Sequence, residues 1–211
     1  MSNGWPATLR IGERAVGAGA PVLVVAEAGV NHNGKLATAI RLVQAAADAG
    51  ADAVKFQAFS ADRLATAAAP AAGYQHARDQ RSLLAELELS PLELAQVKAE
   101  CDALGLIFLA TPFGPRDVAN LHGLGVSAIK IASPDVVNLP LLRVAAATRL
   151  PVILSTGAST LDEVRQAVGT LSSSGCRELV LLHCVSSYPT GQNECNLRAM
   201  DTLRQQFAVP V

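Results

Sequence analysis

Two lysines lie inside apolar runs of the sequence, where a positive charge is hardest to accommodate. Lys55 interrupts the run AVKFQ at 53–57, and Lys130 interrupts the run AIKIAS at 128–133. The chain has only four lysines and otherwise uses arginine for positive charge. A buried ammonium group loses solvation free energy unless an anion lies beside it. We expect the two lysines to bind a shared anionic ligand, a phosphate or a carboxylate; the alternative is that each forms an ion pair with a nearby acid.

Polar side chains also stand where the apolar runs end, one set after each run. In chain order these residues are Glu27, Lys55 and Gln57, Thr111, Lys130 with Ser133 and Asp135, Ser155 with Thr156, and His183 with Ser186 and Tyr188. Hydroxyl groups beside lysines are good ligands for a phosphate group. A single serine there is commonly a helix N-cap, and His183 taken alone fits a core histidine, but six successive strand ends are harder to explain by capping.

The elements that must position these residues alternate between short apolar runs and longer helical patterns. The predicted strands are 22–28, 53–58, 106–111, 128–133, 151–156 and 179–184. The predicted helices are 35–49, 91–104, 115–124, 139–148, 161–172 and 197–207. Strands that alternate with helices predict an α/β fold with a parallel sheet and helical crossovers.

Side-chain alternation within the strands favours a (β/α)8 TIM barrel over a doubly wound sheet. Val54 and Phe56 share one face of their strand, while Lys55 and Gln57 share the other. In a barrel the large apolar side chains pack outward against the helices and the polar ones point inward. Six strand–helix units are visible, with 208–211 as the start of a seventh strand, so we expect one incomplete barrel domain over residues 1–211.

Three further segments stand apart from this pattern. Residues 9–20 predict a hairpin that closes the floor of the barrel. The connection at 59–90 is much longer than a usual strand–helix loop and is either a substrate lid or a solvated insertion with a short helix. The string NHNG at 31–34 fits a turn before a helix equally well as a functional motif.

The composition excludes several classes of protein. Half of the residues are hydrophobic, 17% are charged and 4% are aromatic, and the net charge is −1, which offers no footprint for nucleic acid or an anionic membrane. No secretory signal or membrane-length apolar run is visible. The four cysteines form no CxxC pair and fit reduced thiols, so we expect a cytoplasmic protein.

Seven short motifs along the chain resemble those of the sialic acid synthase (NeuB-like) family. They are VAEAGVNHNG at 25–34, DAVKFQ at 52–57, ATPF at 110–113, KIAS at 130–133, LSTG at 154–157, LHCVSSYP at 182–189 and NLRAM at 196–200. They follow the family's order over nearly the whole chain, so they are specific together although none suffices alone. The match is to the N-terminal barrel portion, without the family's C-terminal antifreeze-like domain.

The resemblance implies an enzyme that condenses phosphoenolpyruvate with an N-acetylated amino sugar such as N-acetylmannosamine. The product would be a nine-carbon 2-keto-3-deoxy sugar acid of the sialic acid type, with release of phosphate. By match to the family motifs, the catalytic residues are Glu27, Lys55 and Gln57, and the substrate-binding residues are Lys130, Thr111, Ser133, Ser155, Ser186, Asp135 and Tyr188. Glu27 would handle protons or position a water molecule.

The resemblance also implies a divalent metal, manganese or magnesium, that activates the aldehyde of the sugar. Its histidine ligands lie on later strands in the family, and neither His32 nor His183 matches them, so no metal ligand is assigned in this chain. An unclosed barrel exposes apolar strand edges, so we expect a homo-oligomer or a completing partner.

Two other functions remain open. One is another phosphoenolpyruvate-dependent synthase that makes a shorter sugar acid, against which the NHNG and LHCVSSYP motifs argue. The other is a non-catalytic remnant or subunit that binds a ligand or a partner. Turnover by the chain alone would separate the non-catalytic remnant from the synthase.

Overall fold

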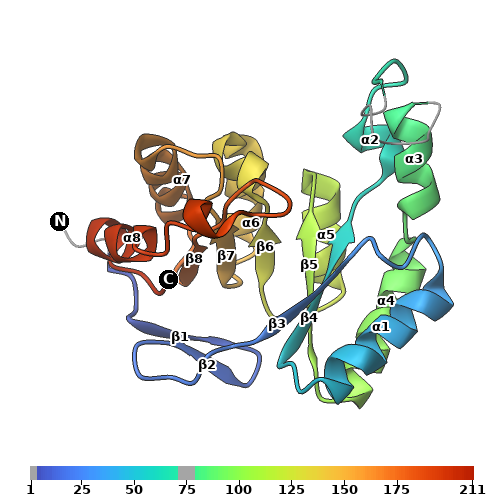
Figure 1. The fold of residues 1–211 in the computed structure, drawn as a ribbon, viewed down its shortest axis with the longest axis horizontal. Coiled ribbons are helices and arrows are strands. Elements are labelled where there is room, and N and C mark those ends of the chain that lie inside the picture. The colour runs from blue at the N-terminus through green and yellow to red at the C-terminus, as the bar shows by residue number, and fades with distance from the viewer. Residues whose placement is uncertain (1–3, 71–78) are drawn as a thin grey trace. The chain divides into compact units, whose positions relative to one another are not determined.

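A computed structural model describes residues 4–70 and 79–211 of the chain (Figure 1). The chain divides into two compact units. We call Val24–Val126 the central unit, and Met1–Leu23 together with Ser127–Val211 the terminal unit. Each unit contains a parallel three-stranded sheet with helical crossovers, so the predicted α/β fold is confirmed. The single incomplete barrel stays a prediction.

The central unit is built on the sheet β3–β4–β5, with strands Val25–Gly29, Ala53–Ala58 and Ile107–Pro112. Its crossover helices are α1 (Leu36–Asp48) and α4 (Pro91–Ala103), and α5 (Pro115–Gly123) follows β5. Val54 and Phe56 of β4 are fully buried, whereas Lys55 and Gln57 are only partly buried. The alternation read from the sequence is therefore real, and it turns the polar side chains away from the helix-covered face.

The connection between β4 and α4 contains two described helices, α2 (Ala61–Leu64) and α3 (Gln80–Leu87). Asp79 is the N-cap of α3, and its side chain accepts the N–H of Ser82 at 2.8 Å. Ser90 forms a capping box with Glu93 at the start of α4, which fixes where the connection ends. The second half of this connection is thus ordered by local hydrogen bonds.

The terminal unit is built on the sheet β6–β7–β8, with strands Ile129–Ile131, Val152–Ser155 and Leu179–Leu182. The 3-10 helix η1 (Ser133–Val137) follows β6 directly. The helices α6 (Leu139–Ala147), α7 (Leu161–Ser173) and α8 (Ala199–Phe207) and the 3-10 helix η2 (Gln192–Glu194) complete the unit. The predicted hairpin is present as β1 (Thr8–Ile11) paired with β2 (Arg14–Gly17).

The predicted seventh strand at 208–211 is wrong as a strand, because this segment has no regular structure. Ala208 adopts a left-handed conformation that caps α8, and Pro210 has no N–H to donate to a ladder. One contact of the expected kind exists, because the N–H of Leu181 in β8 donates to the carbonyl of Pro210 at 3.0 Å. The segment lies beside β8 without forming a strand.

None of the helices in residues 4–70 and 79–211 combines the length and the hydropathy that a membrane span requires. The four cysteines are free thiols. Burial raises the pKa of the Cys101 thiol to about 12 and also raises the pKa of Cys176, so both thiols act as core residues rather than nucleophiles.

Candidate functional site

Glu27, Lys55 and Thr111, on three neighbouring strands, form one polar cluster in the central unit. Lys55 Nζ lies 2.9 Å from Glu27 Oε2 and donates to Thr111 Oγ1 at 3.2 Å. Strand register explains this, because Glu27 of β3 is paired with Lys55 of β4. Gln57 of β4 is paired with Thr111 of β5, so the four residues occupy neighbouring positions at one end of the sheet.

The ion pair of this central cluster joins a lysine that is shielded from solvent to a glutamate that is exposed. The Lys55 side chain is 13% exposed, whereas the Glu27 side chain is 55% exposed. The ion-pair alternative for Lys55 is therefore correct as far as Glu27 is concerned. An exposed carboxylate beside a shielded ammonium group can still accept or return a proton, and the lysine can still meet an incoming anion.

Lys130, Ser133 and Ser155 form the second cluster, at the strand ends of the terminal unit. Lys130 is 7% exposed and donates to Ser155 Oγ and to the carbonyl of Ile131, both at 2.6 Å. Ser133 Oγ accepts the backbone N–H of Gly157 at 3.0 Å. Strand β7 ends at Ser155 and η1 begins at Ser133, so both hydroxyls sit directly at strand ends.

Gly157 is a site residue to which the sequence analysis assigned no role. A side-chain Cβ at this position would lie 2.8 Å from Ser186 Oγ, 3.0 Å from Ser133 Oγ and 3.1 Å from the carbonyl of Cys184. The missing side chain therefore lets the hydroxyls of Ser133 and Ser186 approach the backbone after β7. Its place directly after a strand end, rather than after a helix, was the available signal.

Neither Asp135 nor Tyr188 takes part in the hydrogen bonds described for the two lysines. Asp135 lies in η1 and accepts a hydrogen bond from Asn138 Nδ2 at 3.0 Å. Burial raises the pKa of the Asp135 carboxyl, and the hydrogen bond from Asn138 opposes that rise. Tyr188 is 93% exposed, so the structure does not bring its ring into a cluster with the other predicted residues.

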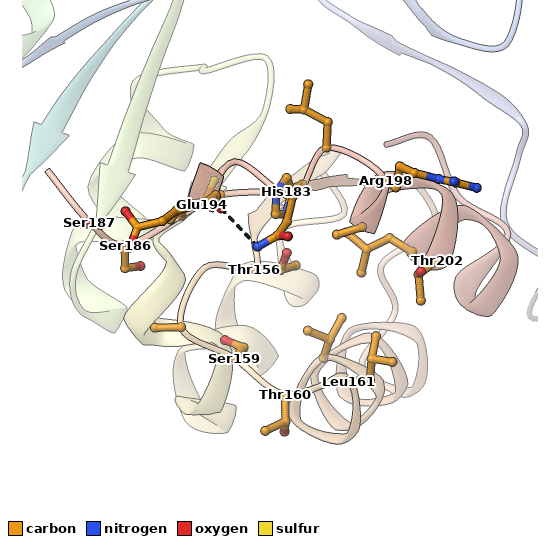
Figure 2. Close-up of a pocket in the computed structure, with 18 residues that line it drawn as sticks. Thr156, Ser159, Thr160, Leu161, His183, Ser186, Ser187, Glu194, Arg198 and Thr202 are labelled. Carbon is orange, nitrogen blue, oxygen red and sulfur yellow. Dashed lines mark hydrogen bonds between the residues drawn. The ribbon is translucent and has the colours of Figure 1, made fainter. Parts of the chain in front are cut away.

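An open pocket of about 1090 Å³ lies beside Ser186 in the terminal unit. Figure 2 shows Thr156 and His183 near its centre, Ser186 on one side and Leu161 with Thr202 on the other. The ring Nε2 of His183 lies 2.8 Å from the carbonyl of Cys195, so the ring has a hydrogen-bond partner, but the residue is half-buried and lines the pocket rather than the core. The lining mixes hydroxyl groups with apolar side chains and with two charged residues, Glu194 and Arg198.

The described residues contain no group of three or more His, Cys, Asp or Glu side chains that could hold a metal ion. Glu27, the exposed acid of the central cluster, already faces Lys55. The residues described here therefore do not by themselves fit the divalent metal that the resemblance implies, and its ligands stay unassigned.

The sequence leaves the role of His32 open, because NHNG at 31–34 fits a turn and a functional motif equally well. It is 0% exposed, and its Nδ1 accepts the N–H of Gly34 at 3.1 Å. Nε2 is also buried, with no hydrogen-bond partner among residues 4–70 and 79–211. The motif at 31–34 is thus a packed turn, and its histidine is a core residue of the central unit.

Comparisons with known proteins agree with these motifs. The chain is 42% identical over 197 residues to an N,N'-diacetyllegionaminic acid synthase of Legionella pneumophila, covering 89% of this chain and 55% of that protein. It is 36% identical over 190 residues to an N-acetylneuraminate-9-phosphate synthase of Drosophila melanogaster, covering 88% and 51%. The chain therefore spans about half the length of these relatives.

The structure agrees as well. A crystal structure of N-acetylneuraminic acid (sialic acid) synthetase from Leptospira borgpetersenii, in complex with citrate, has a TM-score of 0.86 and 34% identity, covering 96% of this chain and 68% of that one. The model of the NeuB family matches residues 42–211. These findings show that the chain belongs to the NeuB family, the family of the sialic acid synthases.

Proposed function

We propose that the chain is part of a synthase that condenses phosphoenolpyruvate with an N-acetylated amino sugar to give a sialic-acid-type sugar acid and phosphate. The observation that carries the proposal is that each unit holds a shielded lysine within a parallel strand, bonded to a hydroxyl group near the carboxyl end of the neighbouring strand. Polar groups at the carboxyl ends of parallel strands form the active sites of α/β enzymes. The named relatives support the class of reaction.

The proposed ligands of phosphoenolpyruvate are the two lysines and the hydroxyls around them. Its phosphate and carboxylate groups are both anionic, and ammonium and hydroxyl donors form strong hydrogen bonds to such groups. The full set is Lys55, Thr111, Lys130, Ser133, Ser155 and Ser186. The Leptospira relative was solved with citrate, a ligand that also carries carboxylates, which supports an anion-binding role.

Glu27 is the proposed proton-handling residue. In the condensation, the enol carbon of phosphoenolpyruvate attacks the aldehyde carbon of the open-chain sugar, and the aldehyde oxygen takes up a proton. Water then adds to the cationic carbon, losing a proton, and phosphate leaves. Glu27 contacts Lys55, a proposed phosphoenolpyruvate ligand, so its carboxylate would lie within reach of the reacting carbons and could accept the proton from water.

The proposed acceptor contacts are Gln57, Asp135 and Tyr188. A neutral sugar needs hydroxyl, amide and carboxyl groups rather than cations, and these three side chains supply them. Burial raises the pKa of Asp135, and its carboxyl oxygens can accept hydrogen bonds from sugar hydroxyls. The exposed Tyr188 would need a bound sugar or a further segment to cover it.

The remaining parts of the proposal follow the family. We propose that the two sheets belong to one (β/α)8 barrel, that activity requires manganese or magnesium, and that the protein works as an oligomer or with a completing partner. The relatives named above make three different sugar acids, so the acceptor is proposed only as an N-acetylated amino sugar.

Phosphate release tests the proposal. The purified chain is incubated with phosphoenolpyruvate, manganese and either N-acetylmannosamine or a di-acetamido sugar, beside the Legionella relative as a positive control. Acceptor-dependent phosphate release by the chain supports a synthase. Saturable phosphoenolpyruvate binding without turnover supports the non-catalytic alternative, and neither binding nor turnover contradicts the proposed ligand set.

A further inference from the structure

The turn between β3 and α1 makes an unusually close contact with α3. Asn33 and Gly34 are both in the left-handed region, with φ values of 52° and 65°. A Cβ on Gly34 would lie 2.1 Å from the backbone carbonyl oxygen of Glu86, near the end of α3. No side chain fits in that space, because real Cβ atoms do not approach an oxygen so closely. Glycine is therefore required here by contact as well as by conformation.

The buried side chain of His32 holds this turn by a hydrogen bond. Its ring is 0% exposed, its Nδ1 accepts the N–H of Gly34 at 3.1 Å, and its ring centre lies 6.1 Å from that of Phe56 in β4. The bond to Gly34 places the proton of the neutral ring on Nε2. The imidazole thus ties the conformation of the turn to the strand that carries Lys55 and Gln57.

The first part of the same connection is also held in place. The N–H of Ala61, at the start of α2, donates to Glu88 Oε2 at 2.8 Å, so residues on either side of the connection are joined. Arg63 of α2 forms an ion pair with the buried Asp117 of α5 at 2.7 Å. Figure 1 shows α3 next to the turn that follows β3. The described parts of the connection are fixed to the turn after β3, to α5 and to one another, which argues against a freely moving lid.

We propose that the turn at 31–34 fixes the position of α3, and we call this turn the seat of α3. We also propose that Gly34 is a positioning residue for the acceptor sugar. The placement of α3 by the turn follows from the contacts alone, whereas the role of Gly34 toward the acceptor rests on the proposed function. Phosphoenolpyruvate would be bound by side chains of the strands themselves, which the seat does not move. Gln57 is the proposed acceptor contact in the central unit, and the connection held by the seat starts directly after Gln57 and Ala58 of β4.

The test compares Gly34→Ala with Gly50→Ala. Both glycines have a positive φ, 65° and 75°, but a Cβ on Gly50 meets nothing within 4 Å. The strain of a left-handed alanine is therefore common to both variants, and only Gly34→Ala collides with α3. A third variant, Glu88→Ala, removes the acceptor of the Ala61 N–H without touching the turn.

Hydrogen exchange of the amides at 80–87 is measured first, with circular dichroism to confirm folding. We expect at least about tenfold faster exchange in Gly34→Ala than in Gly50→Ala, and an intermediate effect in Glu88→Ala. Kinetics then separate the substrates: the KM for the acceptor should rise at least about tenfold in Gly34→Ala, with the KM for phosphoenolpyruvate within about twofold of the parent.

Unchanged exchange at 80–87 in Gly34→Ala overturns the seat. Faster exchange with both KM values unchanged, or raised equally, overturns the positioning role. If the parent chain shows no turnover with any acceptor, condensation by this chain alone is ruled out, and the exchange rates alone decide whether the seat exists. If Gly34→Ala does not fold, the same exchange and KM measurements are made on Glu88→Ala. That variant loosens the same connection by removing the bond between Ala61 and Glu88.

Discussion

The two units build a polar strand end in different ways. In the central unit the lysine faces a carboxylate, since Lys55 lies 2.9 Å from Glu27. In the terminal unit Lys130 donates to a hydroxyl and a carbonyl, and two further hydroxyls converge at Gly157. The cluster of the central unit is thus organised by an ion pair, whereas the cluster of the terminal unit is organised by closely packed neutral oxygen atoms. Substitutions should reveal that difference, because removing a charge and filling a space disturb different properties.

The largest effect is expected from Lys130→Met, which keeps the length of the side chain but removes its charge. We expect phosphoenolpyruvate affinity to fall about 100-fold or more, since loss of one partner from a shielded charged contact costs several kcal/mol. Isothermal titration measures this. Lys35→Met is the matched control, because Lys35 is exposed, and an equal loss in both variants would contradict a specific role for Lys130.

Glu27→Gln removes the carboxylate from the charge pair and keeps its shape. We expect kcat to fall about 100-fold, as for loss of a general acid–base group, with a small change in the KM for phosphoenolpyruvate. Steady-state phosphate release measures both constants. If kcat is unchanged, Glu27 serves only as the ion-pair partner of Lys55, and the ion-pair interpretation of the central cluster is sufficient.

Gly157→Ala fills the space in which Ser133 and Ser186 approach the backbone. Phosphoenolpyruvate affinity should fall about tenfold, which corresponds to roughly one hydrogen bond to a charged group. The control is Gly169→Ala in α7, where a Cβ meets nothing within 4 Å and alanine favours the helix. Equal affinity in both variants would show that the convergence of hydroxyls has no part in anion binding.

The smallest effect concerns pH and the seat of α3. Burial lowers the pKa of His32 below its ordinary value of 6.5, and the nearby Glu93 opposes that change. The unfolded chain therefore takes up the proton first as pH falls. His32 contributes fully to stability above about pH 6.5, and the contribution is lost as pH falls from there toward its lowered folded pKa.

Urea unfolding at about pH 7.5 and about pH 5.5 measures this effect. The parent should lose stability at the lower pH, and His32→Phe should lose less between the two pH values. His122→Gln, which removes an exposed histidine of α5, should keep the dependence of the parent. A His32→Phe profile identical to that of the parent would assign the pH dependence to other groups.

Local patterns predicted most of the fold. The six strand–helix units follow from residue periodicity and helix-ending glycines, and the structure has all of them. Lys55 beside Thr111 and Lys130 beside Ser155 follow from parallel register, because strand ends meet at one edge of a sheet. These contacts depend on neighbouring strands, which a sequence pattern can anticipate.

Contacts between distant segments could not be predicted in this way. The approach of Gly34 to Glu86, and of Gly157 to Ser186, depends on tertiary packing that no periodicity records. Residues 208–211 form no strand because Ala208 caps α8 and Pro210 lacks a donor. Tyr188 belongs to the motif LHCVSSYP, yet the residue is exposed, since a loop position does not fix where a side chain points.

The central claim is that the two lysine clusters bind phosphoenolpyruvate, and titration of that compound into the purified chain tests it most directly. The account predicts saturable binding that Lys55→Met and Lys130→Met each weaken and that Lys35→Met leaves unchanged. It also predicts competition by inorganic phosphate, since part of the contact is to the phosphoryl group. Binding that is absent, or that survives both lysine substitutions unchanged, would contradict the account.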